Sequence, residues 1–437
     1  MNDAAAAILA SMNILILGAN GFIGSAVLSR LLMAGHAVTG LGRDTGGAAR
    51  RFPAARWIRA DLATLQTPEN WADIIGDQEI VINCAGALQD GLRDDLAATQ
   101  GGAMIALYHA ATIAGTSLIV QISARTDGQN ASLPFLATKA RADQALKAAG
   151  IAFVIVRPAL VIGRNAHGGT ALLRALAALP FVTPLVLGES PIATVALDDV
   201  VRAVEMAIAG DIAPSSDLDL ADADTIPLRQ LVALHRAWLG LGAQKSIDLP
   251  SALAGPVSLA ADFAGRLGWR SPLRSTAMAM MREGVLSTGA KPAMAFASAG
   301  ETLAANPAGV QDLWSARLYL LKPVLVVTLA LFWFLSGLIA LLGLEAAAAH
   351  FLPFMGHAAA IGLTVATSLT DMTLGLLTLY RPKARAALTG QIALASAYLL
   401  GGSLLEPQLW LDPLGPFVKV LPAMLLSLMT LAILDER

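Results

Sequence analysis

The chain has 437 residues, enough for two or three domains, and a formal net charge of −2. Its hydrophobic fraction is 56% and only 14% of its residues are charged, whereas soluble domains carry about 25% charged residues. Part of the chain is therefore expected to lie in lipid, and the charge gives no reason to expect a nucleic-acid partner. The single cysteine, Cys84, excludes an internal disulfide framework and a multi-cysteine zinc site, and no metal is expected.

The N-terminal residues 1–11 are predicted to form a disordered extension. The stretch "MNDAAAAILAS" is short and carries Asp3, so we do not interpret it as a signal peptide. From residue 12 onward, the apolar runs "NILILG", "EIVINCAG", "SLIVQIS" and "AFVIVRPALV" alternate with helices expected over residues 23–34, 95–114 and 139–149. Continuous apolar runs of this kind are typical of parallel strands covered on both faces. Residues 12–240 are therefore predicted to form a doubly wound α/β domain.

A glycine-rich turn joins the first predicted strand to the first predicted helix in "ILILGANGFIGSAVLSRLL". Its glycines permit a tight turn, let backbone amides approach a pyrophosphate and allow the helix to pack on the strand. The phosphate would then lie at the positive end of the helix dipole. The residues of this turn predicted to bind a dinucleotide are Gly18, Asn20, Gly21, Phe22, Ile23 and Gly24.

The second predicted strand, "AVTGLGRD", ends in Arg43 followed by Asp44. An acidic residue at this position binds the ribose 2′-hydroxyl of NAD, whereas an arginine holds the 2′-phosphate of NADP. Arg43 comes first, and Arg50 and Arg51 add positive charge, so the predicted cofactor is NADP(H), with NAD as the alternative.

In the middle of the chain, predicted strands and helices alternate less regularly. "DLDLAD" is interpreted as a late strand and "IPLRQLVALHRAWLG" as an amphipathic helix. Helical pieces interrupted by proline and glycine follow, and residues 241–316 are predicted to form a helical region that links the domains and contributes to the substrate side.

The last part of the chain, residues 317–437, is predicted to be a four-helix transmembrane bundle. Four apolar stretches, at about residues 323–344, 358–380, 386–405 and 414–434, each approach the roughly 20 residues that a span needs. Arg381, Lys383 and Arg385 crowd the turn between the second and third stretches, so the positive-inside rule places the N-terminal domain and the C-terminus in the cytoplasm.

One carboxylate, Asp371, falls well inside the second predicted span. An ionised carboxylate at the bilayer centre costs on the order of 3 kcal/mol, so such residues usually face the bundle interior and mark function. The structural alternative is a protonated Asp371 bonded to Thr370, Thr373 or Gln391.

Residues 12–240 resemble an extended or atypical short-chain dehydrogenase/reductase (SDR) of the NAD-dependent epimerase/dehydratase group. "GANGFIG" is similar to the family's glycine turn, and "VALDDVVRAV" is similar to a later helix of the family. The other matching segments are "ADL" with Asp61 and Leu62, "NCAG" with Ala85 and Gly86, "QISA" with Ser123, "TKARAD" with Lys139, and "VRPALVIG" with Pro158.

The resemblance implies an NAD(P)-binding Rossmann fold and a catalytic group with one member replaced. By the resemblance, Lys139 would hold the nicotinamide ribose hydroxyls and Ser123 would orient a substrate carbonyl. The family's acid is a tyrosine four residues before the lysine, where this chain has Phe135. Tyr108 falls in the middle of a predicted helix and is not expected to replace it, so water or Asp127 would have to supply protons.

The membrane half resembles a DoxX-like domain, on the basis of "SLTDMTLG" and "LWLDPLGPFVKVLP" and of the four-span layout. The pairing implies a multi-pass protein of the bacterial inner membrane. The main hypothesis is a reductase or isomerase that acts on a lipophilic substrate, such as a quinone or isoprenoid, in contact with membrane lipid. The alternatives are a non-catalytic dinucleotide-binding subunit or redox sensor of a membrane complex, and a membrane domain that the SDR-like domain regulates.

Overall fold

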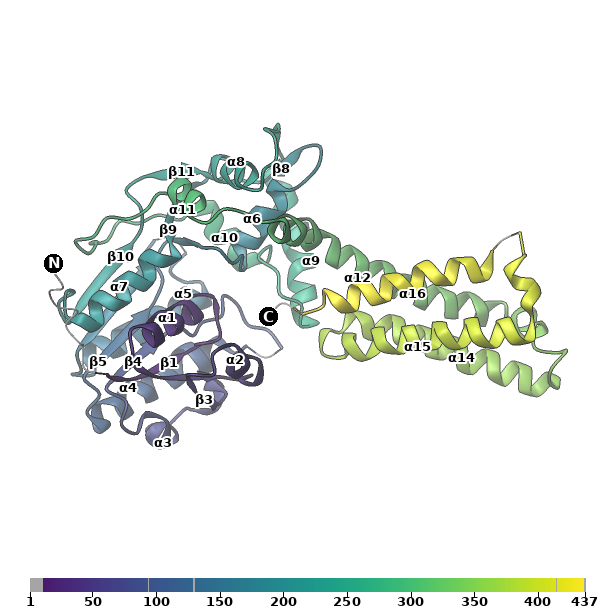
Figure 1. Cartoon of the computed structure of the whole chain (residues 1–437), viewed down its shortest axis with the longest axis horizontal. Helices are drawn as coiled ribbons and strands as arrows, with labels where there is room; N and C mark the ends of the chain where they lie inside the picture. The colour runs from purple at the N-terminus through teal and green to yellow at the C-terminus, as the bar shows by residue number, and fades with distance from the viewer. Residues whose placement is uncertain (1–10, 93, 129, 414, 436–437) are drawn as a thin grey trace, which may run out of the picture. The chain divides into compact units, whose positions relative to one another are not determined.

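The structure, a computed structural model, describes residues 11–92, 94–128, 130–413 and 415–435, so the predicted N-terminal extension lies outside the described residues except for residue 11. The chain forms two compact units. The first contains Met1–Asp262 and Ser271–Leu313, and the second contains Phe263–Arg270 and Trp314–Arg437. Figure 1 shows an α/β unit at the N-terminal end of the chain and a helical unit at the C-terminal end.

The first unit is built on a seven-stranded sheet in which all paired strands are parallel. Its strand order is β10-β6-β5-β4-β1-β2-β3, which contains the 3-2-1-4-5-6 order of dinucleotide-binding folds. The strands are β1 (Asn13–Leu17), β2 (Ala37–Gly42), β3 (Arg56–Arg59), β4 (Ile80–Asn83), β5 (Leu118–Ile122), β6 (Phe153–Pro158) and β10 (Ser216–Leu220). The predicted doubly wound parallel sheet is confirmed.

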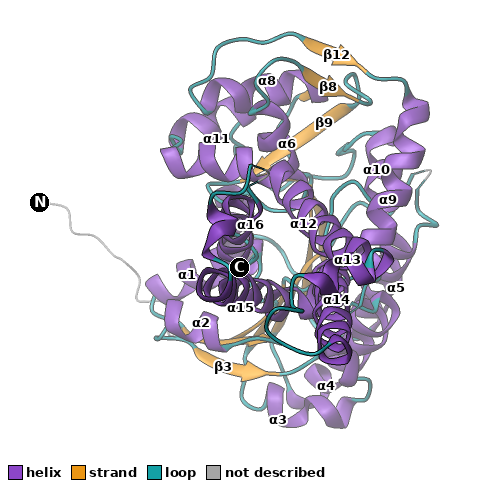
Figure 2. Ribbon diagram, turned by 90° about the vertical axis from the view of Figure 1, so that its right-hand side faces the viewer, coloured by secondary structure: helices purple, strands orange, loops and turns teal. Residues whose placement is uncertain are grey.

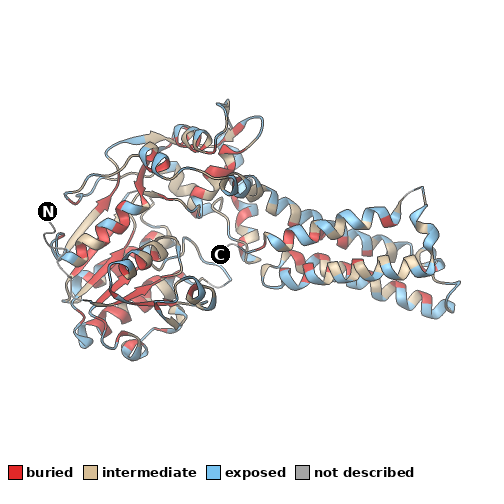
Figure 3. Cartoon of the chain, viewed as in Figure 1, coloured by how far each residue is buried: buried red, intermediate tan, exposed pale blue. Residues whose placement is uncertain are grey.

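Both faces of this sheet are covered by helices, which explains why its central strands β1, β4, β5 and β6 are mainly apolar. Ile14 and Ile16 of β1 pack into one core with helices α1 (Phe22–Met33) and α7 (Leu197–Ala209). Leu15 and Leu17 point to the opposite face, because successive side chains alternate along a strand, and pack with α4 (Ala103–Ala114) and α5 (Pro134–Ala148). Figure 3 shows the sheet strands as mainly buried.

Two predicted elements differ in the structure for identifiable reasons. The run "AFVIVRPALV" divides, because Pro158 ends β6 and β7 (Leu160–Ile162) joins a three-stranded sheet with β9 (Pro191–Ala196) and β11 (Thr225–Pro227). The helix expected over residues 139–149 begins at Pro134, since a proline fits the first helical turn, where its missing N–H is not needed.

A third difference lies in the helix expected over residues 95–114. Its first part, Ala97–Gly102, is a π-helical turn, and the α-helix starts only at Ala103. The remaining elements of the first unit are α2 (Gly46–Arg51), α3 (Ala72–Ile75), α6 (Gly169–Ala177), β8 (Thr183–Leu185), α8 (Leu228–Trp238), β12 (Ser246–Asp248), α10 (Ser275–Glu283) and α11 (Ala299–Ala305). Figure 2 shows these helices and short strands coloured by type.

The second unit is helical. It contains most of α12 (Val310–Leu342), then α13 (Leu344–Ala349), α14 (His357–Leu379), α15 (Arg381–Leu405) and α16 (Pro416–Ala432), and it includes the end of α9 (Ala254–Arg266). Among the described residues, α12, α14 and α15 are long and apolar enough to cross a membrane. The fourth predicted span, α16, has 17 residues, or about 25 Å, which is less than the roughly 30 Å of a hydrocarbon core.

Polar side chains are buried inside the helical unit and bond to each other. Asp371 is 6% exposed and accepts a hydrogen bond from the Tyr398 hydroxyl at 2.9 Å. The alternative partners expected from the sequence are wrong, because Thr370 and Thr373 donate to carbonyls of their own helix and Gln391 donates to Thr378 at 2.7 Å. The carboxylate therefore faces the bundle interior.

Candidate functional site

The glycine turn lies at the carboxyl end of β1 and has no room for side chains at two of its glycines. Gly18 has φ +67°, and a Cβ there would lie 2.9 Å from the backbone of Ala85 after β4. A Cβ on Gly24 would lie 2.3 Å from the Gly18 carbonyl oxygen. The Gly21 N–H donates to that same carbonyl at 2.8 Å. The turn therefore depends on Gly18 and Gly24.

The turn leads into a helix start that fits an anion. Gly21 is the N-cap of α1, and the first helical turn holds no acidic residue. In the part of the chain that the structure describes, no side chain caps the amides of this turn. Amides at such a start point outward and favour negative charge. This geometry fits the pyrophosphate of a dinucleotide, which the free amides at the start of α1 would bind.

The three remaining predicted residues of the turn have different surroundings. Asn20 accepts a hydrogen bond from Arg51 and donates to the Asp44 carbonyl at 3.4 Å. Phe22 stacks on His167, with ring centroids 5.8 Å apart. Ile23 packs against the core beneath the sheet, so its side chain supports the turn and any contribution to binding comes from its backbone.

Further predicted residues lie at the carboxyl ends of the neighbouring strands. After β2, Arg43 forms an ion pair with Asp94 at 2.8 Å. After β3, the Asp61 carboxylate accepts the Ala63 N–H at 3.1 Å and caps a short 3₁₀ helix that begins at Leu62. In open parallel sheets, ligands bind in the crevice outside these strand ends. The structure therefore brings the predicted dinucleotide residues to one edge of the sheet.

Lys139 lies on α5 close to this edge and is buried. Its Nζ donates to the Ile122 carbonyl at 3.0 Å and lies 5.8 Å from the centroid of the Phe135 ring. A Cβ on Gly86 would lie 3.7 Å from the same nitrogen. Burial lowers the pKa of Lys139 to about 8, although the neighbouring Asp143 opposes the shift. Near pH 8, the amine therefore exists in both protonation states.

Ser123 forms a hydrogen bond with a residue that was not predicted from the sequence. Ser123 is 5% exposed. Its hydroxyl donates a hydrogen bond to Asp143 Oδ2 at 2.6 Å. The same carboxylate pairs with Arg157 at 2.9 Å, and Arg157 also pairs with Asp217 at 2.7 Å. Burial raises the pKa of Asp143. The sequence feature that could have pointed to Asp143 is its spacing of four residues from Lys139, which places both residues on one face of α5.

Neither Asp127, which the sequence offered as a proton donor, nor Tyr108, which was not expected to act as one, is suited to give a proton. Tyr108 is fully buried and donates to Gln121 Oε1 at 3.2 Å, and burial raises its pKa. The hydrogen bond from Arg125 lowers the pKa of Asp127, so that carboxyl is ionised at neutral pH and holds no proton to give. Burial also raises the pKa of the Cys84 thiol to about 12, which keeps it protonated.

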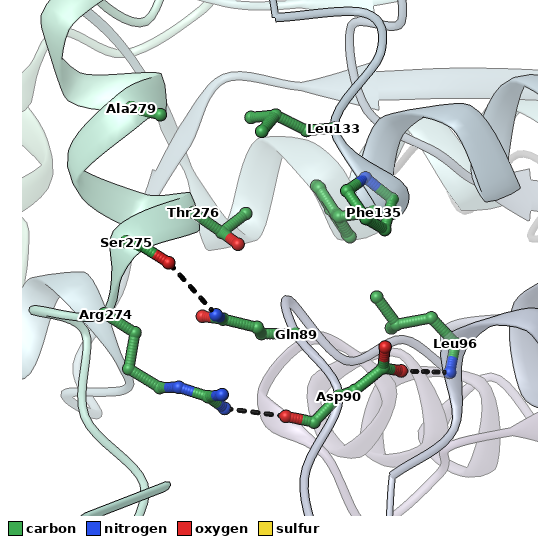
Figure 4. A pocket seen from close by; sticks show the side chains of 10 residues that line it. Gln89, Asp90, Leu96, Leu133, Phe135, Arg274, Ser275, Thr276 and Ala279 are labelled. Carbon is green, nitrogen blue, oxygen red and sulfur yellow. Dashed lines mark hydrogen bonds between the residues drawn. The ribbon is translucent and has the colours of Figure 1, made fainter. Parts of the chain in front are cut away.

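A cavity of about 450 Å³ opens beside Phe135. One part of its wall is apolar, and the other carries amide, guanidinium, hydroxyl and carboxylate groups. The residues that line it are Gln89, Asp90, Leu96, Leu133, Pro134, Phe135, Arg274, Ser275, Thr276 and Ala279 (Figure 4). Of these ten residues, only Phe135 was predicted from the sequence to lie at the site. Pro158, the last predicted residue, lies at the end of β6 opposite Leu220 of β10.

The polar part of the cavity wall is held together by hydrogen bonds that Figure 4 shows in part. Arg274 Nη1 donates to the Asp90 carbonyl at 2.8 Å, and Gln89 Nε2 donates to Ser275 Oγ at 3.4 Å. Gln89 Oε1 is buried and has no hydrogen-bond partner among the described residues. Buried polar atoms are nearly always satisfied, so this oxygen is suited to accept a hydrogen bond from a bound molecule.

Two known protein families match separate parts of the chain. A family described as NAD(P)H-binding matches residues 18–177, from Gly18 through α5 and beyond. The DoxX-like family matches residues 330–428, which include most of the helical unit. The chain therefore consists of an NAD(P)-binding, SDR-like Rossmann domain followed by a C-terminal DoxX-like domain, and the predicted family resemblance is confirmed.

Individual relatives share only part of their length with this chain. An uncharacterized protein of Saccharomyces cerevisiae is 50% identical over 58 residues, which are 13% of this chain and 20% of that protein. An uncharacterized protein of Mycobacterium tuberculosis is 26% identical over 233 residues, which are 53% of this chain and 24% of that protein. The chain thus spans a quarter or less of the length of these curated relatives.

Among solved structures, the enzyme WbmH of Bordetella bronchiseptica, in complex with NAD⁺, has a TM-score of 0.50 to this chain. It is 16% identical, and the match covers 68% of this chain and 97% of WbmH. At this level of identity, the likeness extends to the fold alone.

Proposed function

We propose that the protein is a membrane-anchored, NADP(H)-binding reductase or isomerase that acts on a lipophilic substrate, such as a quinone or an isoprenoid. The observation that carries this proposal is the cavity beside Phe135, which joins an apolar wall of Leu96, Leu133 and Pro134 to a polar wall of Gln89 and Arg274. Pockets of this size and mixed lining are typical of small-molecule sites. Lys139 lies next to Phe135, at the edge of the sheet that carries the glycine turn.

In this proposal, each residue has a role that follows from its position. A bound nicotinamide dinucleotide supplies or accepts a hydride. The Gly18–Gly24 turn binds the pyrophosphate through its amides, and the ammonium of Lys139 donates to the ribose hydroxyls. Gln89 Oε1 accepts a hydrogen bond from the substrate, and Phe135 packs against the apolar ring or chain. Water supplies the proton, because a quinone oxygen is basic enough after hydride addition to take one from solvent.

The direct test is turnover of the full-length protein in lipid nanodiscs. We expect NADPH to be consumed when short-chain quinones or isoprenoid aldehydes and ketones are added one at a time, and not when water-soluble sugars are added. Mass spectrometry of small molecules that co-purify with the protein would identify the nucleotide and the lipid together. Protein that binds NADPH but consumes none with any member of the panel would contradict the catalytic proposal.

The choice of NADP over NAD is part of the proposal and rests on Arg43, whose guanidinium is held at the end of β2 by Asp94. Arg43→Gln removes the charge that would face a 2′-phosphate. We expect the Kd for NADPH to rise about tenfold, which corresponds to about 1.4 kcal/mol, and the Kd for NADH to stay the same. Arg141→Gln, an exposed site on α5, is the matched control, and equal losses for both nucleotides would contradict the assignment.

A non-catalytic dinucleotide-binding subunit or redox sensor is the second candidate. Its support is the hydrogen bond by which Ser123 donates its hydroxyl to Asp143, together with Phe135, which by the resemblance takes the position of the family's acid. In that case NADPH would bind tightly and stabilise the fold without being consumed. The turnover assay in nanodiscs separates the two candidates.

We also propose that the protein is a multi-pass protein of the bacterial inner membrane, with the Rossmann domain and the C-terminus in the cytoplasm. The basic turn between α14 and α15, with Arg381, Lys383 and Arg385, supports this orientation through the positive-inside rule.

A further inference from the structure

Helix α9 carries its large apolar side chains on the outside. Leu259 is 72% exposed and Phe263 is 63% exposed, whereas the opposite face buries the small residues Ala254, Ser258 and Ala261. A helix on the surface of a soluble domain normally shows the reverse arrangement, with its apolar stripe toward the core. Among the described residues, nothing therefore covers the exposed apolar face of α9.

This exposed apolar face is continuous. Single exposed apolar residues are ordinary on protein surfaces, but five residues of α9 lie together on an arc of about 160°, at 100° per residue. The members of this arc are Pro256, Val257, Leu259, Ala260 and Phe263. Arg266, which is also exposed, borders the arc and adds a positive charge at its edge.

The C-terminal end of α9 is attached to the ends of two apolar helices within the second unit. Trp269 Nε1 donates to the carbonyl of Leu379, the last residue of α14, at 2.6 Å. The N–H of Arg381, the first residue of α15, donates to the Leu267 carbonyl at 3.0 Å. The Arg381 guanidinium also lies 5.6 Å from the Trp269 ring centroid. The segment directly after α9 is thus fixed at the turn where these two helices would leave the membrane.

We propose that α9 is an in-plane membrane helix whose apolar arc inserts into the headgroup and upper acyl region of the lipid bilayer. Measured along the helix, Phe263 and Leu259 lie only about 6 and 12 Å from Leu267, at 1.5 Å per residue. Interfacial helices insert their apolar face by about 5–10 Å and keep basic residues at the border, toward the headgroups. Trp269 is a residue type that favours the same interface.

Lipid explains this face better than a protein partner does, because the arc continues directly into a segment bound to the membrane helices. The inference rests on the proposed membrane residence of the second unit. Within the first unit, the Asp262 carboxylate of α9 accepts hydrogen bonds from Gln89 and Arg274 of the cavity wall, each at 3.1 Å.

Depth-dependent fluorescence quenching of the full-length protein tests this proposal. In a Cys84→Ser background, single cysteines at Leu259 and Phe263 are labelled with an environment-sensitive fluorophore. The labelled protein is reconstituted in vesicles of phosphatidylcholine and phosphatidylglycerol. Ile113→Cys, at an 81% exposed position on α4, is the matched solvent control, and Leu331→Cys, a 54% exposed position within α12, is the membrane control.

We expect nitroxide lipids labelled high on the acyl chain to quench the probes at Leu259 and Phe263 at least threefold more than the probe at Ile113. Iodide in the water phase should show the opposite order. Strong iodide quenching at Leu259 and Phe263, or protection from both quenchers, would overturn the proposal in favour of solvent or of a protein partner. If the Leu331 probe also fails to meet the lipid quencher, the membrane residence itself is wrong.

Discussion

Gly24→Ala is expected to abolish dinucleotide binding, with a Kd for NADPH raised at least a hundredfold. The added methyl group would lie 2.3 Å from the Gly18 carbonyl oxygen, a backbone atom that cannot rotate away. To make room, the turn must open, and the amides at the start of α1 then no longer converge on a pyrophosphate. A hundredfold loss corresponds to about 2.7 kcal/mol of binding free energy, which is the scale expected when a preformed anion site is disrupted.

The measurement is equilibrium binding of NADPH, paired with thermal unfolding of the same protein preparation. Gly300→Ala is the matched control, because Gly300 also lies within a helix, α11, but has open space around its Cβ position. The control should bind NADPH normally and unfold at or slightly above the original temperature, since alanine favours helix over glycine. Undiminished NADPH binding by Gly24→Ala would show that the nucleotide does not use this turn.

The parts of this site that could be predicted are those encoded by short segments. The turn from Gly18 to Gly24 joins an apolar strand to a helix within one continuous stretch, so its geometry follows from local sequence alone. The parallel sheet was predictable for the same reason: its central strands β1, β4, β5 and β6, buried on both faces, are largely apolar runs. The edge strands β3 and β10 carry charged residues instead.

Contacts between distant segments could not be predicted in this way. The Arg43–Asp94 ion pair joins residues 51 positions apart, and nothing near Arg43 indicates that a carboxylate would meet it. The cavity beside Phe135 combines residues near 90, near 134 and near 275. No periodicity in one sequence relates these segments, because their proximity results from the packing of whole elements.

Asp143 shows a second limit of prediction from sequence, which concerns the burial of a helix face. The spacing from Lys139 places both residues on one face of α5, but spacing does not reveal whether that face meets water or the sheet. In the structure both are buried, at 6% exposed for Lys139 and 2% for Asp143. The carboxylate consequently binds Ser123 and Arg157 instead of solvent. A pair of charged residues on an otherwise apolar helix face could have indicated that Asp143 belongs to the site. The resemblance to a known catalytic motif included only Lys139 of this pair.

Phe135→Tyr is expected to raise turnover of a carbonyl substrate about 10²–10⁴-fold, the range that a positioned proton donor contributes. Phe135 lines the cavity and is half-buried, so an added hydroxyl can reach a bound substrate without entering the core. Lys139, four residues later on α5, lies 5.8 Å from the ring centroid. While protonated, below its pKa of about 8, it stabilises a phenolate and so lowers the phenol's pKa toward neutrality.

The measurement is the rate of NADPH consumption with an aldehyde or ketone of the panel, compared among variants that bind NADPH equally. Phe135→Leu keeps the apolar contact without a phenol and should show no gain. Adding Lys139→Arg to Phe135→Tyr keeps the positive charge but removes the amine whose pKa is about 8. The part of the pH dependence that comes from Lys139 should therefore disappear, and only the titration of the phenol should remain. A tyrosine variant that binds NADPH and still gives no turnover would place Ser123 and its Asp143 hydrogen bond in a structural role. The dinucleotide would then act as a sensor or structural ligand, because restoring the missing acid could not restore chemistry that the rest of the site no longer supports.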